Sequence, residues 1–298
     1  MKRLSTKRDG LLNFSDYKTI GSKIAYGVFI FLLIMFTLVA IVPILWLFIT
    51  SFKTVNEINS TDYHLFPEVF DINKLFNLWT KLDFGRYYIN TLIVVVGAVI
   101  CSVVFNGLLA YAVGVLKPIG YKVVNVLVLL GYMIPSALAM FPLLMQFTEL
   151  EELLEIEIIN SYVPLWLIFG ANAYYYLLFK DYFEKIPQAL IEAAKVDGLS
   201  DFGIFLKIVL PLSKSIIGVV AIFTMTAAYS DFLLPYLILQ DENMQTVMVA
   251  VYNLSGTTTL DASEMLMLLV ISIIPQIIIF IIFQKQIMNT SASSGMKE

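Results

Sequence analysis

The sequence predicts an all-α membrane protein with six transmembrane helices. Hydrophobic residues make up 59% of the 298-residue chain and charged residues only 14%, whereas soluble domains average roughly 45–50% and about 25%. Six long apolar runs, separated by polar segments, carry most of this hydrophobicity. None of them alternates apolar and polar residues as a membrane β-strand does. A helix also satisfies its own backbone hydrogen bonds in lipid.

Each apolar run is long enough to cross a hydrocarbon core of about 30 Å as a helix. The first run follows a lysine- and arginine-rich segment, but it is too long for a signal peptide and lacks a small-residue cleavage site. Prolines inside several runs indicate kinks at packed positions. The predicted transmembrane domain, residues 26–283, has spans at about residues 26–50, 88–115, 123–147, 159–179, 215–239 and 263–283.

The distribution of lysine and arginine predicts the orientation of these spans. With the N-terminus inside, the inner segments hold fifteen of the nineteen basic residues and the outer segments hold four. Such an excess marks the cytoplasmic side of a membrane protein. We therefore expect a cytoplasmic N-terminal segment (1–25), a cytoplasmic loop (180–214) and a cytoplasmic tail (284–298).

Three outer segments are also distinctive. Residues 51–87 contain Trp79 with several Phe and Tyr, so we expect them to lie on the membrane surface or to pack on a partner. Residues 240–262 are predicted to form a polar loop. Five glutamates lie between Glu149 and Glu157, and this crowding favours a solvated acidic loop over a cation site.

Several functional classes are excluded by composition. A single cysteine, Cys101, and a single histidine, His64, rule out an intrachain disulfide and a conventional His/Cys metal cluster. The basic residues are scattered along the sequence rather than clustered in a patch, so the charge pattern does not indicate nucleic acid binding. A membrane-embedded enzyme would need acid–base groups converging at one depth, yet Asp231 is the only acid well inside an apolar run. No catalytic residue is predicted.

The loop 180–214 is a polar island between two apolar runs. Pro187 suits the first turn of a helix, and residues 188–195 are good helix formers. Gly198 is expected to end this helix and Asp201 to cap the next one. The small side chains after Glu192 would let another surface come close.

This loop resembles the EAA loop of permease subunits of binding-protein-dependent ATP-binding-cassette (ABC) importers. The pattern is E-A-A-x-x-x-G, nine free residues, then I-x-L-P. Its flanks, Phe183-x-x-Ile186-Pro187 and Asp197-Gly198, are similar to the carbohydrate-uptake branch and to its six-helix maltose-transporter-type subunit. The matching residues are Glu192, Ala193, Ala194, Asp197, Gly198, Ile208, Leu210 and Pro211.

The resemblance implies a type I ABC importer permease fold in a bacterial or archaeal cell membrane. The helix around Glu192 would be a coupling helix docked in a cytoplasmic ATPase. The implied partners are a second homologous permease, two ATP-binding-cassette subunits and an extracytoplasmic sugar-binding protein. The chain contains no G-x-x-x-x-G-K-[ST] loop, so ATP and Mg²⁺ would be bound by the ATPase subunits.

A substrate path is predicted from polar groups inside the spans. Asp231 and Tyr229 lie near the end of the fifth run, and Asn172 precedes three tyrosines in the fourth. Where the family often has Trp before an Asn or Asp, this chain has Tyr229-Ser230-Asp231. A non-sugar cargo such as glycerol phosphate, or a stand-alone secondary transporter, are the alternatives. The spans contain essentially no basic residue for an anionic cargo.

Overall fold

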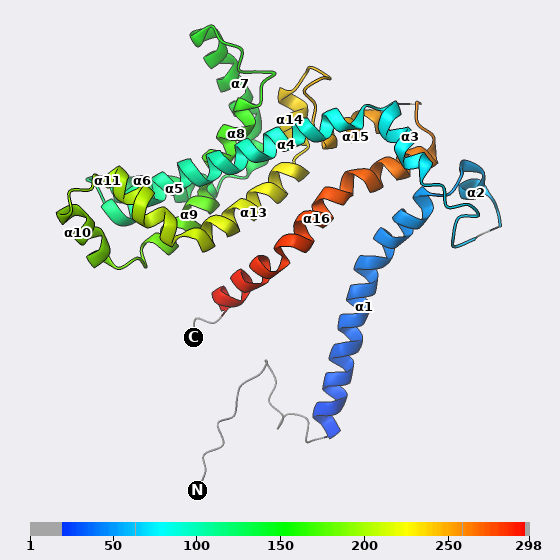
Figure 1. Ribbon diagram of the computed structural model, residues 1–298, viewed down its shortest axis with the longest axis horizontal. Helices are drawn as coiled ribbons and strands as arrows, with labels where there is room; N and C mark the ends of the chain where they lie inside the picture. Colours follow the sequence, from blue (N-terminus) through cyan, green and yellow to red (C-terminus); the bar gives the residue numbers. More distant parts are fainter. Residues whose placement is uncertain (1–19, 63, 258, 296–298) are drawn as a thin grey trace. The chain divides into compact units, whose positions relative to one another are not determined.

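The computed structural model describes residues 20–62, 64–257 and 259–295, and within them it contains helices and no strands. The predicted segment 1–25 therefore lies almost entirely outside the described residues. The described residues divide into two compact units, residues 20–72 with 262–270 and residues 73–261 with 271–295. Figure 1 shows the helices in chain order.

The first unit contains α1 (Ile20–Ser51), α2 (Val55–Asn59) and the beginning of α16 (Ala262–Gly295). The α1 helix is exposed over most of its length, with burial confined to Thr50 and Ser51 at its end. An exposed apolar helix of this length is suited to contact lipid. In the segment that follows α1 in the sequence, the Phe52 and Phe70 rings are stacked, with their centroids 4.0 Å apart.

The second unit holds most of the packed core. One long helix runs from Phe84 to Leu116, made of α4 (Phe84–Cys101), η2 (Ser102–Asn106), α5 (Gly107–Tyr111) and η3 (Ala112–Leu116). Its η2 and η3 portions are π-helical turns, which are rare and frequent at functional sites. Against it pack α8 (Val163–Gly170), α9 (Ala173–Phe183) and α13 (Lys214–Ser230), and α13 runs alongside α4 (Figure 1).

Close packing between these helices depends on small residues. A Cβ atom on Gly97 would overlap the Trp166 indole, whose Nε1 donates to the Ile93 carbonyl at 3.2 Å. A Cβ on Gly170 would lie 2.8 Å from the Phe105 ring. Since lipid is as apolar as the side chains, such tight contacts rather than the hydrophobic effect hold membrane helices together.

Three of the six predicted spans are single long helices, at Ile20–Ser51, Phe84–Leu116 and Ala262–Gln284. The other three were predicted as continuous, and the structure divides each of them. The third run is split into α6 (Tyr121–Tyr132) and α7 (Ser136–Leu154), because Pro135 leaves the helical conformation. The fourth is split between α8 and α9, and the fifth between α13 and α14 (Leu233–Ile238).

Two of the segments that the lysine and arginine distribution predicts to be outer contain more structure than the sequence suggested. Residues 51–87 include α3 (Asn73–Lys81), which packs on α4 with Trp79 against Phe84 and Tyr88. Residues 240–262 are not only a polar loop, because α15 (Val247–Ser255) lies within them and packs on α4. Side chains of α4 hold this segment: Asn90 Nδ2 donates to the Asn243 carbonyl at 2.7 Å, and Thr91 Oγ1 accepts from the Val247 amide at 2.9 Å.

Candidate functional site

The EAA segment, residues 180–214, folds as a compact helical turn-back in the second unit. It contains α10 (Gln188–Val196), α11 (Asp201–Ile204), η4 (Phe205–Val209) and α12 (Leu210–Leu212). The run α11–η4–α12 then meets α13 at an angle of 82°. The predicted helix at 188–195 and its stop at Gly198 are therefore confirmed.

The C-terminus of α10 is a Schellman motif. Gly198 has φ +79°, its amide donates to the Lys195 carbonyl at 3.1 Å, and the Leu199 amide donates to the Ala194 carbonyl at 3.0 Å. Glycine reaches this left-handed conformation without a Cβ penalty. The motif turns the chain sharply between α10 and α11.

The next cap differs from the prediction. Asp201 was expected to cap the helix after Gly198, but Ser200 is the N-cap of α11 and its Oγ accepts from the Gly203 amide at 3.1 Å. Ser200 has extended backbone angles, whereas Asp201 is already helical. Asp201 instead forms an ion pair with Lys195 at 3.1 Å, which links α10 to α11. Both side chains are about half exposed, so this pair contributes ~0–1 kcal/mol.

The α10 helix has one buried face and one exposed face. Ile191 and Ala194 are buried in the same core as Phe183 and Ile204. Glu192 and Ala193 are exposed, and so is Val196, at 87%. Residues 192 and 196 are four apart and share a helix face. The structure therefore anchors α10 by one side and leaves the charged side exposed.

The remaining motif positions lie on the return path to α13. Ile208 and Leu210 are partly buried and pack against the core, whereas Pro211 is exposed. Tyr111 of α5 secures this path, since its hydroxyl donates to the Asp201 carbonyl at 3.1 Å and its ring lies 5.3 Å from that of Phe205. The EAA segment is thus joined directly to the long helix 84–116.

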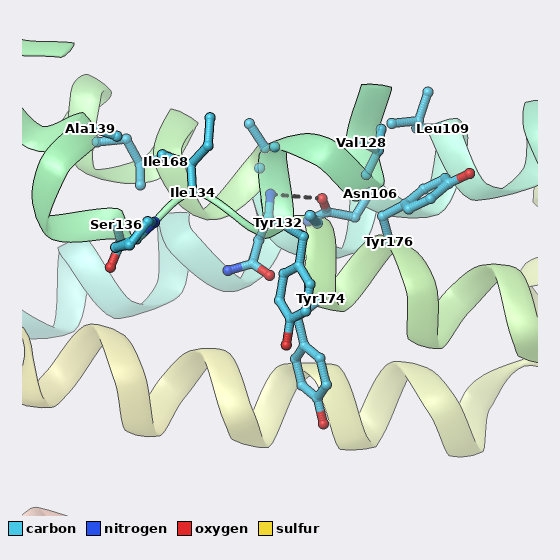
Figure 2. A pocket seen from close by; sticks show the side chains of 16 residues that line it. Asn106, Leu109, Val128, Tyr132, Ile134, Ser136, Ala139, Ile168, Tyr174 and Tyr176 are labelled. Atoms are coloured by element: carbon cyan, nitrogen blue, oxygen red, sulfur yellow. Dashed lines mark hydrogen bonds between the residues drawn. The ribbon is translucent and has the colours of Figure 1, made fainter. Parts of the chain in front are cut away.

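A pocket of about 780 Å³ lies where the third and fourth predicted spans are broken. Figure 2 shows its labelled side chains, with Asn106 between Ser136 on one side and Tyr176 on the other. The Tyr132 and Tyr174 rings are stacked at 6.5 Å. The lining residues are Asn106, Leu109, Val128, Gly131, Tyr132, Ile134, Pro135, Ser136, Ala139, Ile168, Gly170, Ala171, Asn172, Ala173, Tyr174 and Tyr176.

Asn106 makes three hydrogen bonds at the centre of this pocket, and it is not among the residues predicted from the sequence. Its Nδ2 donates to the Ser102 and Phe169 carbonyls at 2.8 and 2.9 Å, and its Oδ1 accepts from the Asn172 amide at 3.0 Å (dashed in Figure 2). A buried side-chain amide inside an apolar run needs hydrogen-bond partners. The presence of an asparagine within the apolar run 88–115 was therefore the sequence feature that could have identified this residue. Asn106 therefore pins the break between α8 and α9.

The predicted substrate-path residues separate into two places. Asn172 lines the pocket and caps α9, because its Oδ1 accepts from the Tyr175 amide at 3.1 Å. Tyr229 and Asp231 are not among the lining residues. The Tyr229 hydroxyl donates to the Ser272 carbonyl at 2.5 Å, and Asp231 Oδ1 lies 3.4 Å from the Leu234 amide at the start of α14. Both therefore have structural contacts at the end of α13.

Comparison with known proteins gives consistent results. The chain is 30% identical over 268 residues to the diacetylchitobiose uptake system permease protein NgcG of Streptomyces coelicolor, covering 89% of this chain and 86% of the relative. It is 34% identical over 286 residues to the galactooligosaccharides transport system permease protein GanQ of Bacillus subtilis, covering 90% and 95%.

The fold also matches a solved structure. A chain from a bacterial ABC transporter involved in the import of the acidic polysaccharide alginate superposes with a TM-score of 0.79 and 23% sequence identity, covering 90% of this chain and 98% of that one. Residues 105–288, well over half of the sequence, match the family described as the binding-protein-dependent transport system inner membrane component. The EAA segment and the pocket both fall within that range, and the chain belongs to this family of membrane transport permeases.

Proposed function

We propose that this chain is a permease subunit of an ATP-driven importer for a sugar or oligosaccharide. An extracytoplasmic binding protein would deliver the cargo, and two ATPase subunits would act on this chain and on a second, homologous permease. The carbohydrate assignment is supported by the cargo named for NgcG and GanQ. The chain would lie in a bacterial or archaeal cell membrane with both termini in the cytoplasm.

The two-sided α10 helix is the observation that carries this proposal. Its buried residues Ile191 and Ala194 fix it to the core, and its exposed Glu192 has no ion pair or hydrogen bond within the described chain. A force applied to α10 by an ATPase would reach the long helix 84–116 through the Tyr111–Asp201 contact. Movement of that helix would change access to the pocket around Asn106.

The pocket favours a neutral polar cargo over an anionic one. None of its 16 lining residues carries a charge, while amides, hydroxyls and aromatic rings are all present. Ser136, Tyr132 and Tyr174 are exposed there and can donate and accept hydrogen bonds with sugar hydroxyls. An anion such as glycerol phosphate would have no positive charge to replace its hydration.

Transport by the reconstituted importer tests the proposal. Glu192→Ala should lower ATP-dependent uptake of a neutral oligosaccharide more than tenfold, since loss of a charged contact at an interface costs ~2 kcal/mol or more. Asp181→Asn is the matched control, because Asp181 is an exposed acid on the same segment but lies on α9, paired with Lys185. Uptake should persist in that control.

Three results would contradict parts of the proposal. Wild-type uptake in Glu192→Ala would contradict the coupling role of α10. Uptake driven by an ion gradient without ATP would support a stand-alone secondary transporter instead. Competition by glycerol phosphate, but not by any sugar of a panel, would keep the importer and change its cargo.

A further inference from the structure

A second pocket, separate from the first, lies at one end of the helix bundle. Its volume is about 350 Å³, and it shares no lining residue with the pocket around Asn106. Three of its lining side chains are lysines and one is a glutamate. The lining residues are Lys117, Tyr121, Lys122, Asn125, Val126, Lys180 and Glu184.

Three helix ends meet to form this basic pocket. Lys117 follows the end of η3 in a left-handed conformation (φ +51°), and its amide donates to the Ala112 carbonyl at 2.9 Å. Lys122 lies in the first turn of α6, and Lys180 in the last turn of α9. The three helices pack on one another, so the lysines gather at one end of the membrane-crossing helices.

Specific contacts keep these helix ends together. A Cβ added to Gly114 would be only 3.4 Å from Cγ of both Lys180 and Glu184, so α9 lies close against η3. The Tyr176 hydroxyl donates to Asn125 Oδ1 at 2.8 Å and joins α9 to α6. The basic pocket is therefore built by packed elements rather than by a mobile surface loop.

The charges in the basic pocket do not balance. Lys180 Nζ lies 2.9 Å from Glu184 Oε1, and the Lys180 side chain is only 21% exposed. Glu184 is the one acid among the described lining residues, so Lys117 and Lys122 leave a net charge of +2. A site of this kind attracts an anion that can accept hydrogen bonds from ammonium groups, such as a phosphate.

Apolar surface surrounds the same lysines. Ile119 is fully exposed in the turn between Lys117 and Lys122. Val123 and Leu127 on α6 are each 62% exposed. A soluble phosphate would make no use of this surface, whereas a lipid joins an anionic phosphate to acyl chains that would cover it.

We infer that the basic pocket binds the phosphate of an anionic phospholipid, with the acyl chains lying along the exposed face of α6. Lys117, Lys122 and Lys180 contact the phosphate, and Ile119 inserts among the lipids beside it. This site is additional to the proposed transport function. The proposed orientation of the chain would place this lipid in the cytoplasmic leaflet. Binding in detergent does not depend on that orientation.

Lipid binding to the purified full-length chain tests this inference. Phosphatidylglycerol should bind more tightly than zwitterionic phosphatidylcholine in native mass spectrometry of lipid-depleted protein. Lys117→Gln and Lys122→Gln should each raise the dissociation constant for phosphatidylglycerol about fivefold, the factor for ~1 kcal/mol per lysine near an anionic lipid surface. Affinity for phosphatidylcholine should not change, which shows that the variants are folded.

Lys185→Gln is the matched control. Lys185, like the pocket residue Lys180, is a lysine of the EAA segment in an i,i+4 ion pair, here with Asp181, but it does not line the basic pocket. It should retain wild-type affinity for phosphatidylglycerol. The inference is overturned if this control weakens binding as much as the pocket variants do, or if the pocket variants bind phosphatidylglycerol normally. Displacement of the lipid by an equal concentration of inorganic phosphate would identify a free-phosphate site instead.

Discussion

Gly198 is a position where the backbone itself restricts the choice of residue. Its φ of +79° is left-handed, and a Cβ added there would meet nothing within 4 Å. Gly198→Ala should therefore destabilise the turn after α10 by ~1 kcal/mol through backbone strain alone, and Gly198→Asn by less. Uptake should be highest with Gly at position 198, lower with Asn and lowest with Ala. The protease sensitivity of residues 188–200, measured on the same variants, should increase in the same order.

A second glycine provides the control for that prediction. Gly218 lies within α13, has no left-handed φ and would also meet nothing within 4 Å. Gly218→Ala should leave both uptake and protease sensitivity unchanged. Equal behaviour of the two alanine variants would show that the conformation of Gly198 does not matter.

Residue roles could be predicted from the sequence where a single local rule decides them. Gly198 ends α10 as expected, because a glycine after a run of helix formers is a strong stop signal. Ser200 and Asp201 are both good caps, and only the backbone angles show that Ser200 is used. The importance of Asn106 depends on partners 63 and 66 positions away, which no local pattern reveals.

At the scale of elements, α2 provides a pH-sensitive contact outside the membrane spans. Thr54 and Glu57 form a capping box, and Glu57 Oε1 also accepts from the Glu68 amide at 2.6 Å. The Glu68 and Thr54 amides hold the pKa of Glu57 below its usual 4.5. This stabilising contribution is present above pH 4.5 and is lost as the pH falls through the lowered folded-state pKa.

The corresponding prediction concerns Glu57→Gln. At neutral pH, this variant should expose residues 60–70 to protease faster than the wild type, because a neutral amide accepts hydrogen bonds more weakly than a carboxylate. On acidification the wild type should approach the variant, while the variant changes little. Equal cleavage rates at neutral pH would mean that the Glu57 carboxylate does not order this segment.

Span continuity is an element-scale property that hydropathy does not resolve. Residues 123–147, 159–179 and 215–239 are predominantly apolar, yet each is divided between two helices. Pro135 precedes α7 and Asn172 caps α9, so local break signals were present in two of the three. The two helices of each divided span are both apolar, because both lie against lipid or other helices. A hydropathy profile therefore does not detect the break between them.

On the scale of the whole molecule, the EAA segment and the pocket are joined through one unit. Tyr111 holds the segment to α5, and Asn106, five residues earlier on the same long helix, binds the backbone beside the pocket. The fold class could be predicted from composition and run length, because lipid restricts a spanning chain to helices or closed barrels. The contact of α10 with an ATPase could be predicted only from the resemblance of the segment to the EAA loop of importer permeases. By itself, α10 is an ordinary amphipathic helix.

Site-specific crosslinking to the ATPase tests the central claim most directly. A photo-crosslinking amino acid in place of Val196, which is 87% exposed on α10, should link this chain to the ATPase subunit of the purified importer on irradiation. The same amino acid in place of Phe280, 58% exposed on α16, should give no such product. Absence of the crosslinked product at position 196, or an equal yield at positions 196 and 280, would contradict docking of the ATPase subunit on α10.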